Sequence, residues 1–270
     1  MLRLPLRFLV RRGVALVFVT SAVGVVHAAS LGGISSDSLV AWAMPAEPLT
    51  ICGVGLPNVP CVVPRGTVFD GKFEWNADVF VLGEVTGKLD VDDGSVLVAS
   101  TGIVGKDITQ TGDGGVTLLD GSLVDGKIKE FGDGSVFVDG VVAKQVEEHD
   151  DGDLTIGPNA VVDKKVKESG AGSVFVDGVV NDDIEEHDDG DLNVVAGALI
   201  GGDATEAQAG NLTVSGPSWI GGKAKEANDG DLTVGADAVI DDDADASPNG
   251  VCTISPAAII NGDLRGDCAI

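Results

Sequence analysis

Apolar residues recur in a short, fixed rhythm through most of the chain. They alternate with polar residues and resume six positions later, as Leu232, Val234 and Ile240 do. Short period-2 runs broken at six-residue intervals predict short strands joined by tight corners. A glycine opens each unit, 18 or 20 residues after the one before, at Gly94, Gly114, Gly134, Gly152, Gly172, Gly190, Gly210, Gly230 and Gly250.

Equivalent positions of successive units carry the same kind of side chain. One column is Ile108, Ile128, Val146, Val166, Ile184, Ala204, Ala224, Ala244 and Leu264, and another is Val104, Val124, Val142, Val162, Val180, Ile200, Ile220, Ile240 and Ile260. An antiparallel sandwich or barrel, the alternative fold, needs alternation but no such columns. We therefore predict an all-β, single-stranded parallel β-helix, a triangular β-solenoid of about eleven coils of 18–20 residues.

The two unit lengths predict how the corners are built. Three sides of six residues make an 18-residue coil, so we expect the longer units to carry two extra residues beside the opening glycine. We expect glycine and aspartate to gather at the corners because positive φ is needed there.

Two charged columns accompany the apolar ones on the third side of the coil. Glutamate follows the Ile108 column by two positions in Glu130, Glu148, Glu168, Glu186, Glu206 and Glu226. Because burying unpaired carboxylates is unfavourable, we expect the chain to bend outward and hold them in solvent. The residues between are Lys129, Glu147, Lys167, Glu185, Thr205 and Lys225, which predicts exposed Lys–Glu pairs between neighbouring rungs.

The N-terminal stretch has the composition of an export signal. Arg3, Arg7, Arg11 and Arg12 precede an apolar run that ends in Val26-His27-Ala28, which predicts a signal peptide over residues 1–28. An uncleaved anchor is the alternative, but the run is shorter than the roughly 20 residues of a membrane-spanning helix. We expect a mature chain with no transmembrane helix, secreted, periplasmic or at the cell surface, with a cap over residues 29–60 and the solenoid over residues 61–270.

The four cysteines fit an exported protein. Cys52 and Cys61 are close enough to close a small loop, and Cys252 and Cys268 could do the same at the other end. Disulfides are typical of oxidising compartments. Metal binding is the alternative, but no pair has CxxC spacing.

Composition narrows the classes of partner. Aromatic residues make up 4% of the chain and Tyr is absent, so the core must be aliphatic. The net charge is -26, and removal of residues 1–28, with four Arg and no acid, makes it -30. Such a chain repels phosphate backbones and anionic lipids, so we expect no nucleic-acid partner.

Several coils resemble those of a known family. LTIGPNAVVDKKV from Leu154, SVFVDGVVNDDI from Ser173, LTVGADAVIDDDA from Leu232 and CTISPAAIINGDL from Cys252 are similar to coils of bactofilins, the bacterial polymer-forming cytoskeletal proteins. The resemblance covers residues 61–268 loosely and implies a right-handed helix that polymerises end to end without nucleotide. Bactofilins are cytoplasmic, whereas this chain carries an export signal.

An enzyme family shares part of the pattern. Strings such as Ile220-Gly221-Gly222-Lys223-Ala224 also fit the hexapeptide pattern of left-handed β-helix acyltransferases, so the residues leave handedness open. We nevertheless predict no enzyme and no catalytic or cofactor-binding residues, because such an enzyme needs a catalytic His and a cytoplasmic acyl donor. Polysaccharide-cleaving β-helices need aromatic platforms, which this chain lacks.

The string EEHDDGD, at Glu147 to Asp153 and Glu185 to Asp191, has metal-ligand chemistry. Its copies lie two coils apart, about 10 Å along the rod, so His149 and His187 cannot share one ion. Duplication of a two-coil block containing GSVFVDGVV explains both copies. We predict no specific metal site and no cofactor, with weak Ca²⁺ binding by acidic corners.

One outward column reads Thr117, Phe137, Thr155, Phe175, Asn193, Thr213, Thr233 and Thr253. Threonine ladders can order ice-like water, but threonine is also a good strand residue. We predict an exported, non-catalytic structural β-solenoid, a polymer-forming or cell-surface scaffold that self-associates through its coil ends. The alternative is a secreted module that binds an ice, cation or glycan surface.

Overall fold

The computed structural model describes residues 9–11, 14–20, 26–29, 50–53, 58–247, 249–266 and 268–269. The chain forms two units, Met1–Pro48 and Leu49–Ile270. In the first, β1 (Leu9–Arg11), β2 (Val14–Thr20) and β3 (Val26–Ala29) form an antiparallel sheet. The predicted signal peptide and cap lie largely outside the described residues, and both stay predictions.

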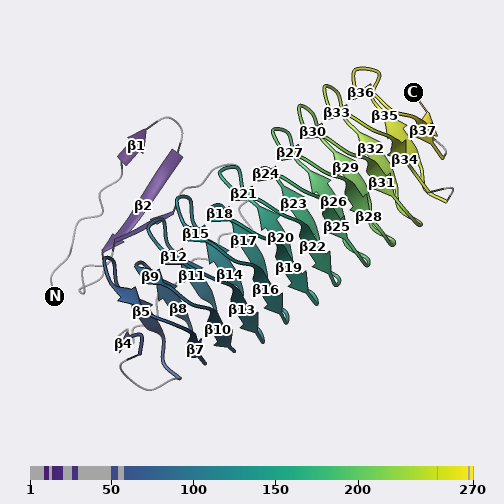
Figure 1. The fold of residues 1–270 in the computed structure, drawn as a ribbon. Helices are drawn as coiled ribbons and strands as arrows, with labels where there is room; N and C mark the ends of the chain where they lie inside the picture. The colour runs from purple at the N-terminus through teal and green to yellow at the C-terminus, as the bar shows by residue number, and fades with distance from the viewer. Residues whose placement is uncertain are drawn as a thin grey trace. The chain divides into compact units, whose positions relative to one another are not determined.

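The second unit is a parallel β-helix with three sheets, as predicted (Figure 1). Sheet 1 contains β4 (Thr50–Ile51), β5 (Cys61–Val63), β8 (Val79–Val81), β11 (Val96–Val98), β14 (Val116–Leu118), β17 (Val136–Val138), β20 (Leu154–Ile156), β23 (Val174–Val176), β26 (Leu192–Val194), β29 (Leu212–Val214), β32 (Leu232–Val234), β35 (Cys252–Ile254) and β38 (Cys268–Ala269).

The other two sheets each have eleven strands among the described residues, which agrees with the predicted coil number. Sheet 2 contains β6 (Val68–Phe69), β9 (Glu84–Val85), β12 (Ile103–Val104), β15 (Leu123–Val124), β18 (Val141–Val142), β21 (Val161–Val162), β24 (Val179–Val180), β27 (Leu199–Ile200), β30 (Trp219–Ile220), β33 (Val239–Ile240) and β36 (Ile259–Ile260). Sheet 3 contains β7 (Phe73–Trp75), β10 (Leu89–Asp92), β13 (Ile108–Thr111), β16 (Ile128–Phe131), β19 (Val146–His149), β22 (Val166–Ser169), β25 (Ile184–Glu186), β28 (Ala204–Glu206), β31 (Ala224–Glu226), β34 (Ala244–Asp245) and β37 (Leu264–Arg265).

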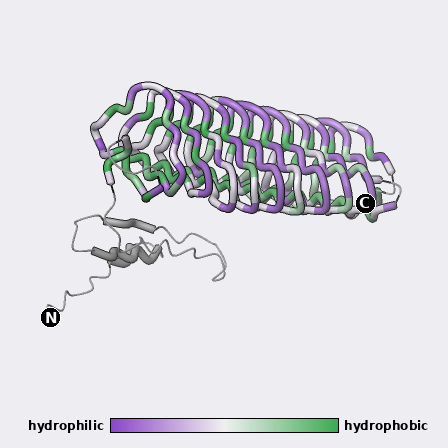
Figure 2. The backbone as a smooth tube through the Cα atoms, turned by 90° about the horizontal axis from the view of Figure 1, so that it is seen from below, coloured by the Kyte–Doolittle hydropathy of each residue, from purple (hydrophilic) through white to green (hydrophobic). Residues whose placement is uncertain are grey.

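The predicted apolar columns form the core. Ile108 pairs in register with Ile128, and Val104 with Val124, and both columns continue in this way to Leu264 and Ile260. Their members are fully buried in every rung except the last. Figure 2 shows hydrophobic and hydrophilic segments aligned from coil to coil along the rod.

The two extra residues of the longer coils lie elsewhere than predicted. Four residues separate β14 from β15, whereas two separate β17 from β18. The extra pair therefore sits at the corner between sheet 1 and sheet 2, away from the opening glycine. Asp120 and Gly121 at this corner are exposed, so its length changes without disturbing the stacked columns.

The opening glycines are required for close stacking, which corrects the conformational reason given above. None of them has a positive φ, although Gly112, Gly121 and Gly132 at other corner positions do. Asp93, Asp150, Asp188 and Asp237 also have positive φ, which confirms the prediction for those corners. A Cβ added to Gly210 would lie 1.6 Å from the carbonyl oxygen of Gly190. The turns between sheet 3 and sheet 1 stack backbone on backbone and leave no room for a side chain.

Substitution of one opening glycine should therefore be severe. We expect Gly210→Ala to lower the free energy of unfolding by more than about 2 kcal/mol, because the new methyl group displaces backbone. Gly235→Ala is the matched control, since its Cβ would lie 3.2 Å from the nearest atom. Chemical denaturation measures both, and equal losses would refute the stacking argument.

Candidate assembly surfaces and a buried acid column

The C-terminal rung leaves its core side open among the described residues. Leu264 is 36% exposed and Ile260 is half-buried, although both continue fully buried columns. Their equivalents one rung earlier, Ala244 and Ile240, are 0% exposed. Core side chains at this end thus contact solvent where every earlier rung covers them with the next coil.

The N-terminal rung is closed by aromatic rings. Phe73 lies between Phe69 and Trp75, with ring centroids 4.7 and 5.3 Å apart. The Trp75 indole N–H donates to the Val59 carbonyl oxygen at 2.8 Å. Phe73 and Trp75 are buried, so these three rings form an aromatic plug in the first rung that the structure describes.

A disulfide braces each end of sheet 1. Cys52 is bonded to Cys61, and Cys252 to Cys268, which confirms the predicted disulfides and resolves their pairing. Cys252 and Cys268 are also register partners in β35 and β38. Each bond ties a terminal strand to the core.

The outer face of sheet 2 carries an apolar column that sequence reasoning missed. The outward residues of its two-residue strands stack in register as Ile103, Leu123, Val141, Val161, Val179, Leu199, Trp219, Val239 and Ile259. Ile103, Val141, Leu199 and Ile259 are between 36% and 52% exposed. The sequence feature that could have predicted this column is a pair of adjacent apolar residues in each unit, such as Val141-Val142 and Leu199-Ile200. Neighbouring residues of a strand point to opposite faces, so each pair places one apolar side chain inside and one outside.

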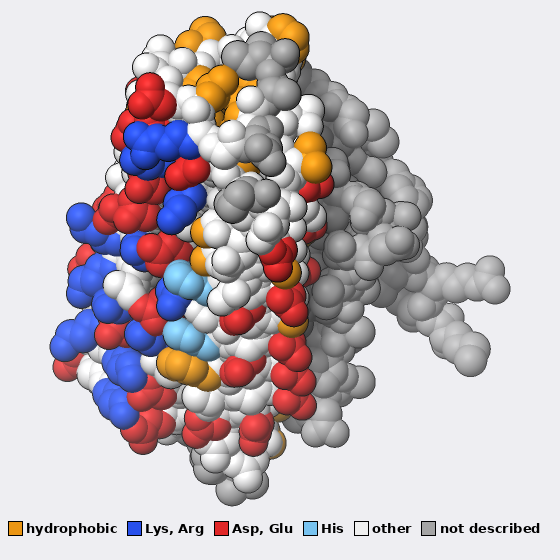
Figure 3. All heavy atoms as spheres, turned by 90° about the vertical axis from the view of Figure 1, so that its right-hand side faces the viewer, with side chains coloured by type: hydrophobic (Ala, Val, Ile, Leu, Met, Phe, Trp, Pro, Cys, Tyr) orange, Lys and Arg blue, Asp and Glu red, His pale blue; other side chains and the backbone are white. Residues whose placement is uncertain are grey.

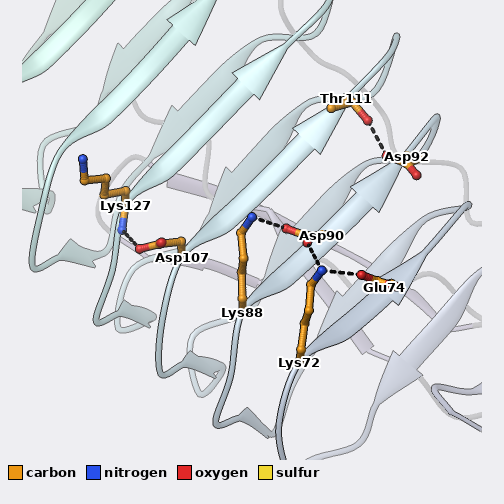
Figure 4. Close-up of polar contacts among 8 residues, drawn as sticks. All are labelled: Lys72, Glu74, Lys88, Asp90, Asp92, Asp107, Thr111 and Lys127. Atoms are coloured by element: carbon orange, nitrogen blue, oxygen red, sulfur yellow. Dashed lines mark hydrogen bonds and ion pairs between the residues drawn. The ribbon is translucent and has the colours of Figure 1, made fainter.

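The outer face of sheet 3 is charged instead. Lys72 forms ion pairs with Glu74 and with Asp90, the latter at 2.9 Å, and Lys88 contacts Asp90 at 2.8 Å (Figure 4). Glu74, Lys88 and Asp90 line a shallow, open hollow with Asp92. Figure 3 shows basic and acidic side chains intermingled along one face, with the histidines among them.

The predicted Lys–Glu column has the expected register and includes one of the expected ion pairs. Lys129, Glu147, Lys167 and Glu185 stack as proposed. Glu147 pairs with Lys129, whereas Glu185 pairs with Lys165 at 2.7 Å, from the preceding corner. Burial opposes ionisation of Glu147, but the neighbouring Lys129 and His149 lower its pKa overall.

In each EEHDDGD string, the first glutamate points to the outer face of sheet 3 and the second points into the core. Glu147 points outward, where its carboxylate lies 3.2 Å from His149 Nε2, while Glu148 is fully buried. His149 also stacks on Phe131 with ring centroids 4.7 Å apart. His187 repeats the outward contact with Glu185 at 3.1 Å. Within the described residues no group of three His, Cys, Asp or Glu side chains is placed to hold a metal ion.

The predicted outward column of sheet 1 is in register from Thr117 to Thr253. Phe137 and Phe175 interrupt it, and Phe175 is 39% exposed. Only Thr213, Thr233 and Thr253 form an unbroken threonine run, at the C-terminal end.

The glutamate column is buried, which overturns the prediction that it faces solvent. Glu130, Glu148, Glu168, Glu186 and Glu206 are 0% exposed and Glu226 is 1% exposed. They stack in register, one per rung, and Gln110 occupies the same column in the rung before. The strands of sheet 3 stay extended past the Ile108 column, so a residue two positions on must also point inward.

Protons and turn amides make this burial possible. Glu148 accepts from the Gly152 N–H at 3.2 Å, and Glu226 accepts from the Gly230 N–H at 3.1 Å. Neither oxygen of Glu168 has a hydrogen-bond donor as its partner in the described part of the protein. Because two carboxylates cannot hydrogen-bond to each other without a proton, a protonated carboxyl supplies the missing donor.

The pKa values of the column follow from that arrangement. Burial, then the neighbouring Glu148, raises the pKa of Glu130 to about 9, and burial with Glu186 and Glu148 raises that of Glu168 to about 10. Burial also raises the pKa of Glu148, to about 7, but the adjacent glutamates act in the opposite direction there. Glu148 thus accepts hydrogen bonds from protonated Glu130 and Glu168 on either side.

No family model matches the chain, and neither the curated proteins nor the solved structures contain a significant match. Among the described residues there is also no helix long and apolar enough to span a membrane.

Stability should fall as pH rises, because these glutamates keep protons in the folded state that the unfolded chain releases near the ordinary pKa of 4.5. The protonated glutamates stabilise the folded state fully below about pH 4.5. This stabilisation is lost progressively as the pH rises from 4.5 to about 10. We expect the free energy of unfolding to drop from pH 5 to pH 9 by roughly 1.4 kcal/mol per pH unit for each proton held, hence by about 5 kcal/mol or more for the column. Denaturation at fixed salt measures this.

The variant Glu168→Gln separates the column from general charge repulsion. Gln resembles the protonated acid and already occupies the column at Gln110, so this variant should gain stability at pH 9 and change little at pH 5. Glu84→Gln removes the same charge from the outer face of sheet 2 and should leave the pH slope unchanged. Equal slopes in both variants would contradict the assignment.

Proposed function

We propose that the protein is an exported, non-catalytic scaffold that self-associates through its C-terminal rung. The observation that carries this proposal is the open core at Ile260 and Leu264, in a rod whose preceding nine rungs bury the same columns completely. Exposed strand edges and core side chains favour pairing with another chain. The two disulfides suit an extracellular location, and the bactofilin resemblance supports an assembling solenoid.

The unequal ends favour tail-to-tail pairing. The aromatic plug closes the N-terminal rung, so it offers no open core to an incoming C-terminal rung. The C-terminal rung of a second copy does, and the two would pack against each other. Such an interface is isologous and therefore closes at a dimer. Arg265 borders the open rung and is held by Asp243 at 2.9 Å, which leaves the apolar side chains as the main contact.

A ligand-binding surface is the second candidate. The run of Thr213, Thr233 and Thr253 on the outer face of sheet 1 favours it, because successive rungs present hydroxyls about 4.8 Å apart. A binding module of this kind would stay monomeric and take up its ligand saturably.

Small-angle X-ray scattering tests the C-terminal contact. We expect the longest dimension to increase with concentration by at least one solenoid length, roughly 50 Å for eleven rungs. Leu264→Glu should prevent this, weakening the contact at least about tenfold, because a carboxylate would be buried in the interface. Thr233→Glu adds the same charge to an outer face and should behave as the unmodified chain. Lengthening that survives Leu264→Glu would exclude this end.

A further inference from the structure

The apolar column on sheet 2, from Ile103 to Ile259, differs from the other outer faces of the solenoid. Nine consecutive rungs each place one aliphatic or aromatic side chain there. Sheet 3 carries ion pairs, and the column on sheet 1 mixes threonine, asparagine and phenylalanine. A continuous apolar row on a chain of net charge -26 is typical of an interaction surface.

We propose that this column is a lateral contact between two copies of the chain, packed side by side and antiparallel. The spacing of the side chains selects a second copy as the partner. Each rung repeats at about 4.8 Å, so an identical rod brings every member of the row into contact at once. A twofold axis across the row matches it to itself, as isologous interfaces require.

The charge of the surface excludes other classes of partner, and its area indicates a weak contact. The acidic chain repels nucleic acid and anionic lipid. Nine rungs span about 40 Å, and a face about 10 Å wide buries about 400 Å² on each copy. The total, about 800 Å², is below the roughly 1,200 Å² of a stable interface. The lateral contact is therefore weak by itself and, because both rods are acidic, strengthens with salt.

Combined with the tail-to-tail contact, the lateral contact would produce a polymer. This part of the inference rests on the proposed function. An antiparallel pair holds one open C-terminal rung at each end. Tail-to-tail contacts between such pairs make an open chain, whereas either isologous contact alone stops at a dimer. Two weak contacts in one assembly also strengthen each other through effective concentration.

Scattering and sedimentation of four forms of the full chain distinguish the two contacts. The unmodified chain should form long particles, the lateral variant Val179→Glu/Leu199→Glu should form dimers of doubled length, and Leu264→Glu should form dimers of doubled cross-section. The combined variant should be monomeric. Thr213→Glu/Thr233→Glu, on the neighbouring rungs of sheet 1, is the charge-matched control.

In the Leu264→Glu chain only the lateral contact remains, and its dissociation constant should fall when NaCl increases from about 0.05 to 0.5 M. Adding Val179→Glu/Leu199→Glu to this chain should raise the same dissociation constant at least about tenfold. Val179→Thr/Leu199→Thr, a neutral change to a good strand residue, should weaken it in the same direction and guards against misfolding. A cross-section that never changes with concentration, or equal loss in the sheet 1 control, would overturn the lateral contact. Failure of the tail-to-tail contact would instead leave doubled cross-sections in the unmodified chain.

Discussion

Parallel backbone pairing between successive coils, always in the same register, is the constraint on which the rest of this structure depends. Residue by residue, β16 pairs with β19 and β19 with β22, so a side chain has its own equivalents as its nearest neighbours above and below. Each position is therefore selected for contact with copies of itself about 4.8 Å away. Aliphatic positions become a core, and glycine positions become a backbone stack with no space for Cβ.

Like charges are the difficult case for such stacking, and the two faces of sheet 3 solve it differently. On the outer face, lysine from the same column or from a corner neutralises glutamate, as with Lys129 and Lys165. On the inner face no lysine reaches Glu168, and the neutralising cation is the proton itself. The core is thus most stable under acidic conditions, where these glutamates keep their protons.

Periodicity alone predicted the fold, because the registers of the Ile108 and Val104 columns are written in the spacing of the chain. It also predicted that Glu130 and its equivalents stack. Their orientation was wrong because the burial penalty was assessed for the charged form, whereas a carboxyl group can enter the core neutral. The apolar column on sheet 2 was missed because Val141 and Leu199 stand beside core residues and read as part of the same strand.

The variable corner between sheet 1 and sheet 2 gives this architecture a capacity that a globular core lacks. It already accommodates either two or four residues, between β17 and β18 and between β14 and β15, while all three sheets keep their registers. Whole coils can accordingly be copied or deleted without repacking a core, as the repeated GSVFVDGVV block illustrates. The same corner is where foreign peptides could be grafted, one per coil, to display a linear array of epitopes at a spacing set by the backbone.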